Sequence, residues 1–356
     1  MKHAKLIVSL VVLAVLIGFG GWAYHHVGFD FAHFRLQLAQ VNWTKIAIGL
    51  GCIYLAYVVR AVRWALLLRN NKKVPLLSLT GTQVIGFTSV ALVGRVADLA
   101  RPYLVSKKTG LTLSSQIAVY IVERLFDAGS MALIFSVAIL LAPAESLPHP
   151  EIFKRVGYWG LAGTAAGALF MVFVRVSGGV LAGFCERTIG VLSKRVGRAI
   201  GDKIRSFRTG LDTLRTPTDL AMTLGISLAM WGLITMAYME TAQAFTASPQ
   251  LASMTLAKGL VLMIVSGGAS VFQLPVLGWF TQIGVVAAAL SSFFAVPPEP
   301  ATACAAMLLI VTFLSIVPVG LIWAQVENVS LRRIAKDSEE AGETVSAQAV
   351  GKPREA

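Results

Sequence analysis

The chain has 356 residues, of which 56% are hydrophobic and 14% are charged, and it carries a formal net charge of +13. Soluble domains contain about 25% charged residues, so this composition excludes an ordinary soluble protein. The basic residues gather in short segments between long apolar runs, which is typical of a polytopic membrane protein and not of a nucleic-acid-binding one. We therefore expect an all-α integral membrane protein with no soluble domain of any size.

Apolar runs close to the length of a membrane span follow one another along the chain. They lie at residues 6–24, 46–68, 76–94, 113–141, 152–174, 220–245, 251–272, 281–296 and 301–324. The first run has a basic start, but its apolar core is longer than that of a signal peptide and no small-residue cleavage site follows. We interpret it as a retained helix.

The positions of Lys and Arg predict which segments face the cytoplasm. Lys2 and Lys5 place the N-terminus there, and the basic residues within 69–73, 175–215 and 332–336 place those segments on the same side. If the run 76–94 crossed the membrane fully, the basic residues that follow it and those of 175–215 would lie outside. We therefore predict that this run is re-entrant, which keeps every basic loop in the cytoplasm.

The count of crossings does not decide whether the later runs, 251–272 and 281–296, cross the membrane or form a re-entrant pair. Both arrangements return the chain to the cytoplasm. The linker 266–280 is rich in Gly and contains Pro275, which favours a broken, partly inserted pair. The expected fold therefore has about six to eight spanning helices with one or two re-entrant segments.

Two further segments are expected on the cytoplasmic side of a membrane domain that extends over residues 1–329. The segment 178–216 contains apolar residues at helical spacing with basic residues beside them, which predicts an amphipathic helix on the membrane surface. These apolar residues are Val196, Ile200, Ile204, Phe207, Leu211 and Leu214. The polar segment 330–356 predicts a disordered cytoplasmic tail.

Six charged residues stand inside or directly behind two of the apolar runs. Three are basic and three are acidic: Arg95, Arg101 and Arg124, and Asp98, Glu123 and Asp127. Each would cost about 2.5–3.5 kcal/mol in a membrane if it were unpaired. Since the signs balance, we predict a mutually paired cluster between the re-entrant segment and the run 113–141. Such residues indicate a functional site; an ion-pair clasp that only pins the re-entrant segment is the alternative.

Arg60 and Arg63 lie toward the cytoplasmic end of the run 46–68 and allow two interpretations. They can extend to the membrane interface, or one can face a cavity and supply the positive charge that an anionic lipid headgroup needs. The two broken segments also resemble each other. Gly94 is followed four residues later by Asp98, and Gly278 four residues later by Gln282, as in transporters whose halves are related.

Three motifs occur in order: RAVRW at 60–64, GRVADLARPYLVSKKTG at 94–110 and VERLFD at 122–127. Together they resemble the lysylphosphatidylglycerol synthase transmembrane-region family, also called flippase-like domain proteins. The resemblance implies re-entrant helices around a lipid-accessible cavity and movement of polar lipids or lipid-linked compounds between leaflets. The family's first motif corresponds to Gly94, Asp98 and Arg101. Its second, a Pro- and Gly-rich turn before an acid, corresponds to Pro275, Gly278 and Gln282, with Gln in the place of the acid.

We expect a lipid translocator of the bacterial cytoplasmic (inner) membrane, with both termini in the cytoplasm and anionic or lipid-linked membrane lipids as its partners. The residues expected along the headgroup path are Arg60, Arg63, Gly94, Arg95, Asp98, Arg101, Glu123, Arg124, Asp127, Pro275, Gly278 and Gln282. No catalytic residue, metal, cofactor or nucleic acid is expected. Two alternatives stay open: a non-transporting partner of a lipid-synthesis complex, and a membrane-embedded headgroup transferase that uses Glu123 or Asp127.

Overall fold

The computed structural model describes most of the chain between residues 38 and 331. The described residues are 35, 38–69, 72–143, 150–191, 193, 196–198, 200–201, 204–205, 216–269, 277–331, 336–337 and 340. The expected first helix at 6–24, three of the six apolar residues of the amphipathic stripe (Phe207, Leu211 and Leu214) and nearly all of the tail after 331 lie outside them. Within the described residues every regular element is a helix.

Six helices in the described part of the chain are long and apolar enough to cross a membrane, and the protein is a multi-pass membrane protein. They are α3 (Trp43–Leu68), α4 (Leu76–Val93), α6 (Leu113–Leu141), α7 (Pro150–Gly190), α9 (Pro217–Gln243) and the continuous stretch Pro298–Val326. The last contains α13 (Pro298–Leu309), the π-helical turn η4 (Ile310–Leu314) and α14 (Ile316–Val326). Each helix coincides with an apolar run, so the expected all-α polytopic fold is confirmed.

The chain divides into two compact units, and each is described by itself. The first unit contains Met1–Leu50 and Met236–Phe313, and the second contains Gly51–Thr235 and Leu314–Ala356. Both α3 and α9 contribute residues to each unit because their bounds include the division points.

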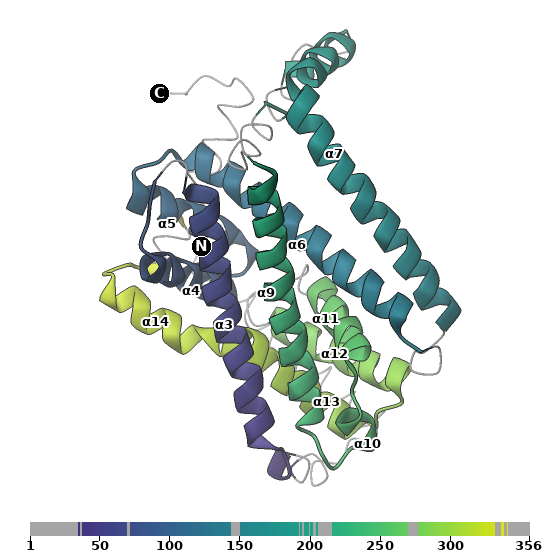
Figure 1. The fold of residues 1–356 in the computed structure, drawn as a ribbon. Helices are drawn as coiled ribbons and strands as arrows, with labels where there is room; N and C mark the ends of the chain where they lie inside the picture. Colours follow the sequence, from purple (N-terminus) through teal and green to yellow (C-terminus); the bar gives the residue numbers. More distant parts are fainter. Residues whose placement is uncertain are drawn as a thin grey trace, which may run out of the picture. The chain divides into compact units, whose positions relative to one another are not determined.

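In the second unit, α4 turns back on itself through the 3-10 turn η1 (Arg95–Leu99) into α5 (Ala100–Thr109). The reversal occurs at Gly94, whose φ of 90° lies in a region that glycine adopts without steric cost. At the other end, the Lys108 Nζ donates a hydrogen bond to the Ser78 carbonyl oxygen at 3.2 Å. The end of α5 therefore lies beside the beginning of α4, and the two helices form an antiparallel hairpin (Figure 1).

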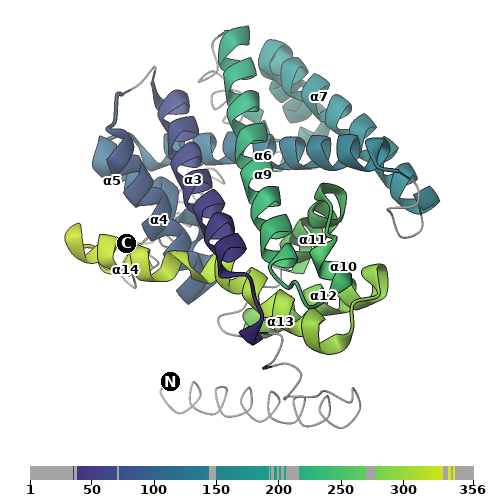
Figure 2. The ribbon, with the colours of Figure 1, turned by 60° about the horizontal axis from the view of Figure 1, so that its bottom comes forward.

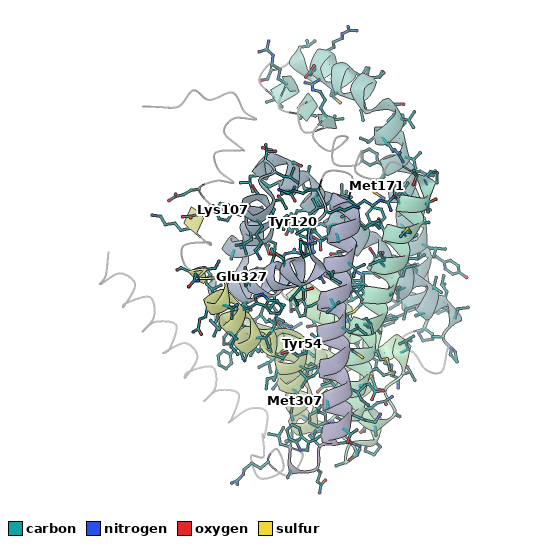
Figure 3. All side chains as sticks on the ribbon, turned by 60° about the vertical axis from the view of Figure 1, so that its left-hand side comes forward. Tyr54, Lys107, Tyr120, Met171, Met307 and Glu327 are labelled. Carbon is teal, nitrogen blue, oxygen red and sulfur yellow. The ribbon has the colours of Figure 1, made fainter. Side chains whose placement is uncertain are left out.

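Helix α14 packs closely against α4 in the same unit. A β-carbon at Gly81 would overlap the Trp323 indole, and one at Gly320 would overlap the Thr88 side chain. The Thr88 hydroxyl donates to the Ile316 carbonyl oxygen at 3.3 Å. The Tyr54 hydroxyl donates to the Ser315 carbonyl oxygen at 2.8 Å, and Figure 3 labels Tyr54. The glycines allow the backbones of α4 and α14 to approach, as small residues do between membrane helices.

Helices α6 and α7 meet at one end and diverge toward the other (Figure 1). At the close end a β-carbon on Gly160 would overlap the Ser136 hydroxyl, and one on Gly157 would lie 3.3 Å from the Leu140 side chain. Helix α7 has 41 residues and is about 62 Å long at 1.5 Å per residue. It continues past the expected end at 174, because no proline interrupts the chain between Pro150 and Pro217.

The first unit contains a second helical hairpin. It is formed by α11 (Leu256–Ala269) and α12 (Leu277–Phe294), which follow the short helix α10 (Pro249–Ala252). The Lys258 ammonium lies 5.8 Å from the centre of the Phe294 ring, which brings the beginning of α11 to the end of α12. Figure 2 shows α11, α12 and α13 side by side. The linker with Pro275 lies outside the described residues.

Candidate functional site

A group of charged side chains from α3, α5 and α6 lies together inside the second unit. We call it the arginine–carboxylate cluster, and its members are Arg60, Arg63, Arg101, Glu123, Arg124 and Asp127. All except Arg124 are buried, and the Arg124 side chain is 39% exposed. Charged groups are rarely this buried unless they are paired.

The two carboxylates are the centre of the cluster. Glu123 and Asp127 are four residues apart on α6 and therefore share one face of the helix. Arg63 bridges them, with Nη2 at 2.8 Å from the Glu123 Oε1 and Nη1 at 2.6 Å from the Asp127 Oδ1. Arg124 bridges them from the other side, at 3.1 and 2.7 Å. This arrangement fixes α3 against α6 with charge-assisted hydrogen bonds.

Arg60 and Arg63 point into the protein and not toward a membrane interface. Arg63 is 0% exposed and also donates to the Ser227 hydroxyl at 2.8 Å. Arg60 is 7% exposed, and its ion pairs are longer, with Nη1 at 3.5 Å from Glu123 and 3.6 Å from Asp127. Its guanidinium lies 4.7 Å from the centre of the Phe87 ring. Arg60 is thus the most weakly bonded of the arginines in the cluster.

Arg101 enters the cluster because α5 returns along α4. Its side chain lies against Gly86, where a β-carbon would overlap it. The Arg101 Nη1 donates to the Gln83 Oε1 at 3.1 Å and to both Glu123 oxygens at 3.2 Å. The guanidinium lies 4.5 Å from the centre of the Phe87 ring and 5.0 Å from that of Tyr120 (Figure 3). These contacts hold the returning helix at the level of the carboxylates.

The ion pairs described for the cluster join four guanidinium groups to two carboxylates. We expected three charges of each sign, with Arg95 and Asp98 among them. Arg101 and Arg124 pair with Glu123 and Asp127 as expected. Asp98 is half-buried on η1, and the Arg95 side chain lies outside the described residues. Arg60 and Arg63 join the expected members, because α3 packs against the face of α6 that carries both acids. The six described members of the cluster carry four positive and two negative charges, which is a surplus of positive charge among them.

Several buried N–H donors in the cluster and on the neighbouring Gln83 have no hydrogen-bond partner within the described part of the chain. They are the Nε atoms of Arg60, Arg63 and Arg124 and the Nε2 atom of Gln83. A buried donor without a partner costs about 1–3 kcal/mol. Donors of this kind beside surplus guanidinium groups are suited to an oxyanion such as a phosphate, which guanidinium groups bind by charge and geometry together.

In the first unit, Gly278 and Gln282 are the described residues of the second motif, and both are uncharged. Gln282 is 7% exposed and its Nε2 donates to the Ser266 hydroxyl at 2.7 Å, which links α12 to α11. Its Oε1 has no hydrogen-bond partner among the described atoms. Gly278 is buried near the beginning of α12. This site can hydrogen-bond a neutral group.

Some members of the site were not expected from the sequence. Gln83 stands alone as an amide within an apolar run, so a search for polar residues in the middle of spans would have found it. Ser227 shares its run with several other hydroxyl residues, so the same search would not have singled it out. Phe87 and Tyr120 carry no such signal, because aromatic residues are common in membrane helices. Within the described residues, no group of three or more His, Cys, Asp or Glu side chains is arranged to hold a metal ion.

A comparison with protein families matches residues 5–320 to the family described as "Lysylphosphatidylglycerol synthase TM region". No curated protein and no solved structure matches the chain. The match extends over both units and includes every member of the arginine–carboxylate cluster and of the Gln282 site. The chain therefore belongs to the lysylphosphatidylglycerol synthase transmembrane-region family, whose name ties it to the handling of membrane lipids.

Proposed function

We propose that the protein moves polar lipids between the leaflets of the bacterial cytoplasmic membrane, with the arginine–carboxylate cluster as the place where the headgroup passes. The observation that carries this proposal is the burial of three arginines and two acidic residues, with Arg124 beside them, among helices that are apolar enough to cross a membrane. Ionisable residues inside membrane segments mark substrate paths by default, since their burial is expensive. The family's link to lipid handling supports a lipid as the substrate.

The hairpin of α4, η1 and α5 serves in this proposal as a re-entrant element. The beginning of α4 and the end of α5 lie together, since Lys108 donates a hydrogen bond to the Ser78 carbonyl oxygen. The lysines at this end of the hairpin are typical of the cytoplasmic side. Helix α5 has 10 residues and is about 15 Å long, half the thickness of the hydrocarbon core. The hairpin thus brings Arg101 to membrane depth from the cytoplasm, and both termini are assigned to the cytoplasm.

An anionic headgroup is the substrate class that this cluster favours. The surplus of guanidinium groups and the unpartnered donors of Arg60 and Gln83 complement a lipid phosphate. The acyl chains of the moving lipid would remain in the hydrocarbon core of the bilayer, while its phosphate moves from one set of arginine contacts to another. The competing interpretation is a clasp in which the same charges only pin α5 against α3 and α6.

The test is a translocation assay with the purified protein in liposomes that contain fluorescent anionic or zwitterionic phospholipids, run with and without an imposed proton gradient and membrane potential. Arg60→Gln is the decisive variant, because Arg60 makes only long ion pairs and its loss brings the cluster closer to neutrality. We expect translocation to fall by about tenfold or more while thermal stability stays near that of the parent protein. The control is Arg69→Gln, just after the same helix and bonded to Asp219. Normal translocation by folded Arg60→Gln would support the clasp.

A further inference from the structure

The first 18 residues of α6 carry one buried face, and that face has a polar half and an apolar half. At about 100° per residue, the polar half lies within about 40° of the direction of Gln116. Its members are Gln116, Tyr120, Glu123, Asp127 and Ser130. Tyr120 is half-buried, and the other four are buried. The apolar half consists of Val119, Val122 and Phe126.

The apolar half of this face is packed against other side chains. Val119, Val122 and Phe126 belong to a hydrophobic core cluster that also contains Trp64 and Leu67 of α3. These side chains therefore have apolar partners within the second unit, and no water is needed to satisfy them.

The polar half is different, because its two ends lack partners. Gln116 and Ser130 are both 0% exposed. Both amide atoms of Gln116 and the hydroxyl oxygen of Ser130 have no hydrogen-bond partner among the described residues. Buried polar side chains are bonded in the large majority of proteins, so these atoms are suited to partners that the protein does not supply. Water and the polar groups of a ligand are such partners.

The row of polar side chains is continuous between its two ends. The Tyr120 ring lies one turn from Gln116, with the Arg101 guanidinium 5.0 Å and the Arg124 guanidinium 5.3 Å from its centre. The arginine–carboxylate cluster thus extends along α6 toward Gln116. From Gln116 to Ser130 the helix rises about 21 Å, compared with about 30 Å for a hydrocarbon core.

We propose that the polar half of this face lines a hydrated passage for anionic groups, which begins beside Gln116, passes the arginine–carboxylate cluster and ends beside Ser130. Ionisable side chains at membrane depth face one another or a water-filled cavity. The inference deepens the proposed function, and it rests on that function for the cytoplasmic position of Gln116. The alternative is a dry face whose polar atoms stay without partners.

The charge of the cluster predicts which ions enter the passage. Its six members carry four positive charges and two negative ones. A passage lined by a surplus of one sign concentrates ions of the opposite sign. Anions should therefore reach Ser130 more readily than cations of the same size.

The experiment measures the reaction of single cysteines in the full chain. Gln116→Cys and Ser130→Cys are made in a protein without Cys52, Cys185 and Cys304 and are reconstituted in dioleoylphosphatidylcholine liposomes. The external reagents are two methanethiosulfonates of similar size, one with a sulfonate and one with a trimethylammonium group, and both attack the thiolate, which forms in water. We expect both positions to react, and Ser130→Cys to react about tenfold faster with the anionic reagent.

Equally buried positions on the apolar half are the matched controls. Val119→Cys and Val122→Cys should stay unreactive, because both valines lie in the hydrophobic core cluster. If Gln116→Cys does not fold, Tyr120→Cys replaces it as a position on the polar half.

Gly129→Cys controls for a different route to Ser130. Gly129 and Ser130 both line a cavity of about 860 Å³ that residues of α6, α7 and α9 surround. A reagent that arrived through this cavity would modify Gly129→Cys as well, since a β-carbon at Gly129 would meet no atom within 4 Å. We expect Gly129→Cys to react at least about tenfold more slowly than Ser130→Cys.

Two ligands identify the source of the anionic group. Dioleoylphosphatidylglycerol in the liposomes presents a lipid phosphate, and glycerol 3-phosphate in the buffer presents a free one. A ligand that occupies the passage should slow the anionic reagent at Ser130→Cys by about threefold or more. Slowing by either ligand supports the passage and names its source, whereas slowing by neither overturns a passage for anionic ligands.

The remaining outcomes separate this inference from the proposed function. Reaction of Gln116→Cys and Ser130→Cys as slow as that of the valine variants overturns the passage, and so does equally fast reaction of Gly129→Cys. Equal rates for the two reagents overturn its preference for anions. An unreactive Ser130→Cys in a protein that still moves lipid removes the passage alone. A reactive Ser130→Cys, together with normal translocation by folded Arg60→Gln, removes the proposed function alone.

Discussion

Arg63 and Asp127 form a hydrogen-bonded ion pair of 2.6 Å between α3 and α6, with the arginine side chain wholly removed from the surface. The same guanidinium reaches Glu123 at 2.8 Å, so a single residue of α3 satisfies both acids of α6. Removing one partner of a buried pair leaves an uncompensated charge and costs about 3–5 kcal/mol. Because arginines outnumber carboxylates in the cluster, the loss of stability depends on whether an acidic or a basic side chain is neutralised.

The first prediction concerns this asymmetry. Asp127→Asn leaves four guanidinium groups around one carboxylate, and we expect it to lower the free energy of unfolding by about 3–5 kcal/mol. Arg60→Gln reduces the surplus and should cost about 1 kcal/mol or less. Thermal unfolding of both variants in the same detergent measures the difference. Equal destabilisation would contradict the surplus of positive charge.

The second prediction concerns the position of Arg101. Gly86→Ala places a methyl group where the Arg101 side chain lies, so the guanidinium should be displaced from Glu123 and Gln83. We expect translocation to fall as far as it does in Arg101→Gln, with a loss of stability of about 1–3 kcal/mol. Gly51→Ala is the control, since its β-carbon would meet no atom within 4 Å. A fully active Gly86→Ala protein would argue against a role for Arg101 in transport.

The third prediction concerns the direction of the α4–α5 hairpin. Single cysteines replace Lys73, Lys107 and Pro143 in a protein without Cys52, Cys185 and Cys304, and membrane-impermeant reagents probe each side. We expect Lys73→Cys and Lys107→Cys to react from the cytoplasm and Pro143→Cys from outside, because a re-entrant hairpin returns to its starting side. If the Lys73→Cys and Lys107→Cys variants reacted with the reagent from opposite sides of the membrane, α4 would cross it.

The fourth prediction concerns the contact between α4 and α14. Gly320→Val adds atoms where Thr88 already lies, and we expect it to destabilise the protein by about 1–3 kcal/mol through overpacking. The control Gly225→Val lies in α9, where a β-carbon meets nothing within 4 Å. Thermal unfolding distinguishes the two, and similar midpoints for both variants would show that α4 and α14 can separate without cost.

The sequence predicts the positions of the helices better than it predicts which charged side chains pair. The bounds of α6 coincide with the apolar run 113–141, because apolar composition determines a spanning helix and the Thr112 hydroxyl caps its first turn. The end of α7 was not predictable from hydropathy, because a helix continues beyond the apolar region until something breaks it. Apolar composition alone thus locates spans but not their ends.

The charged site was predicted in part. Glu123 and Asp127 follow from their spacing on one helix, which is local information. Arg60 and Arg63 were left between two interpretations, because the choice depends on which face of α3 meets α6. A count of charges along the sequence could not show that α3 adds Arg60 and Arg63 to the cluster, because a count does not include which helices pack together.

The turn at Gly94 depends on a residue without a side chain, and the direction of the chain after residue 94 depends on that turn. An L-residue in a left-handed backbone conformation costs about 1–2 kcal/mol, so a side chain at this position favours a backbone that continues forward instead of folding back. In the proposed re-entrant arrangement, a chain that ran straight on would deliver α6, α7 and everything after them to the opposite compartment. One achiral residue would then decide which compartment each later loop occupies.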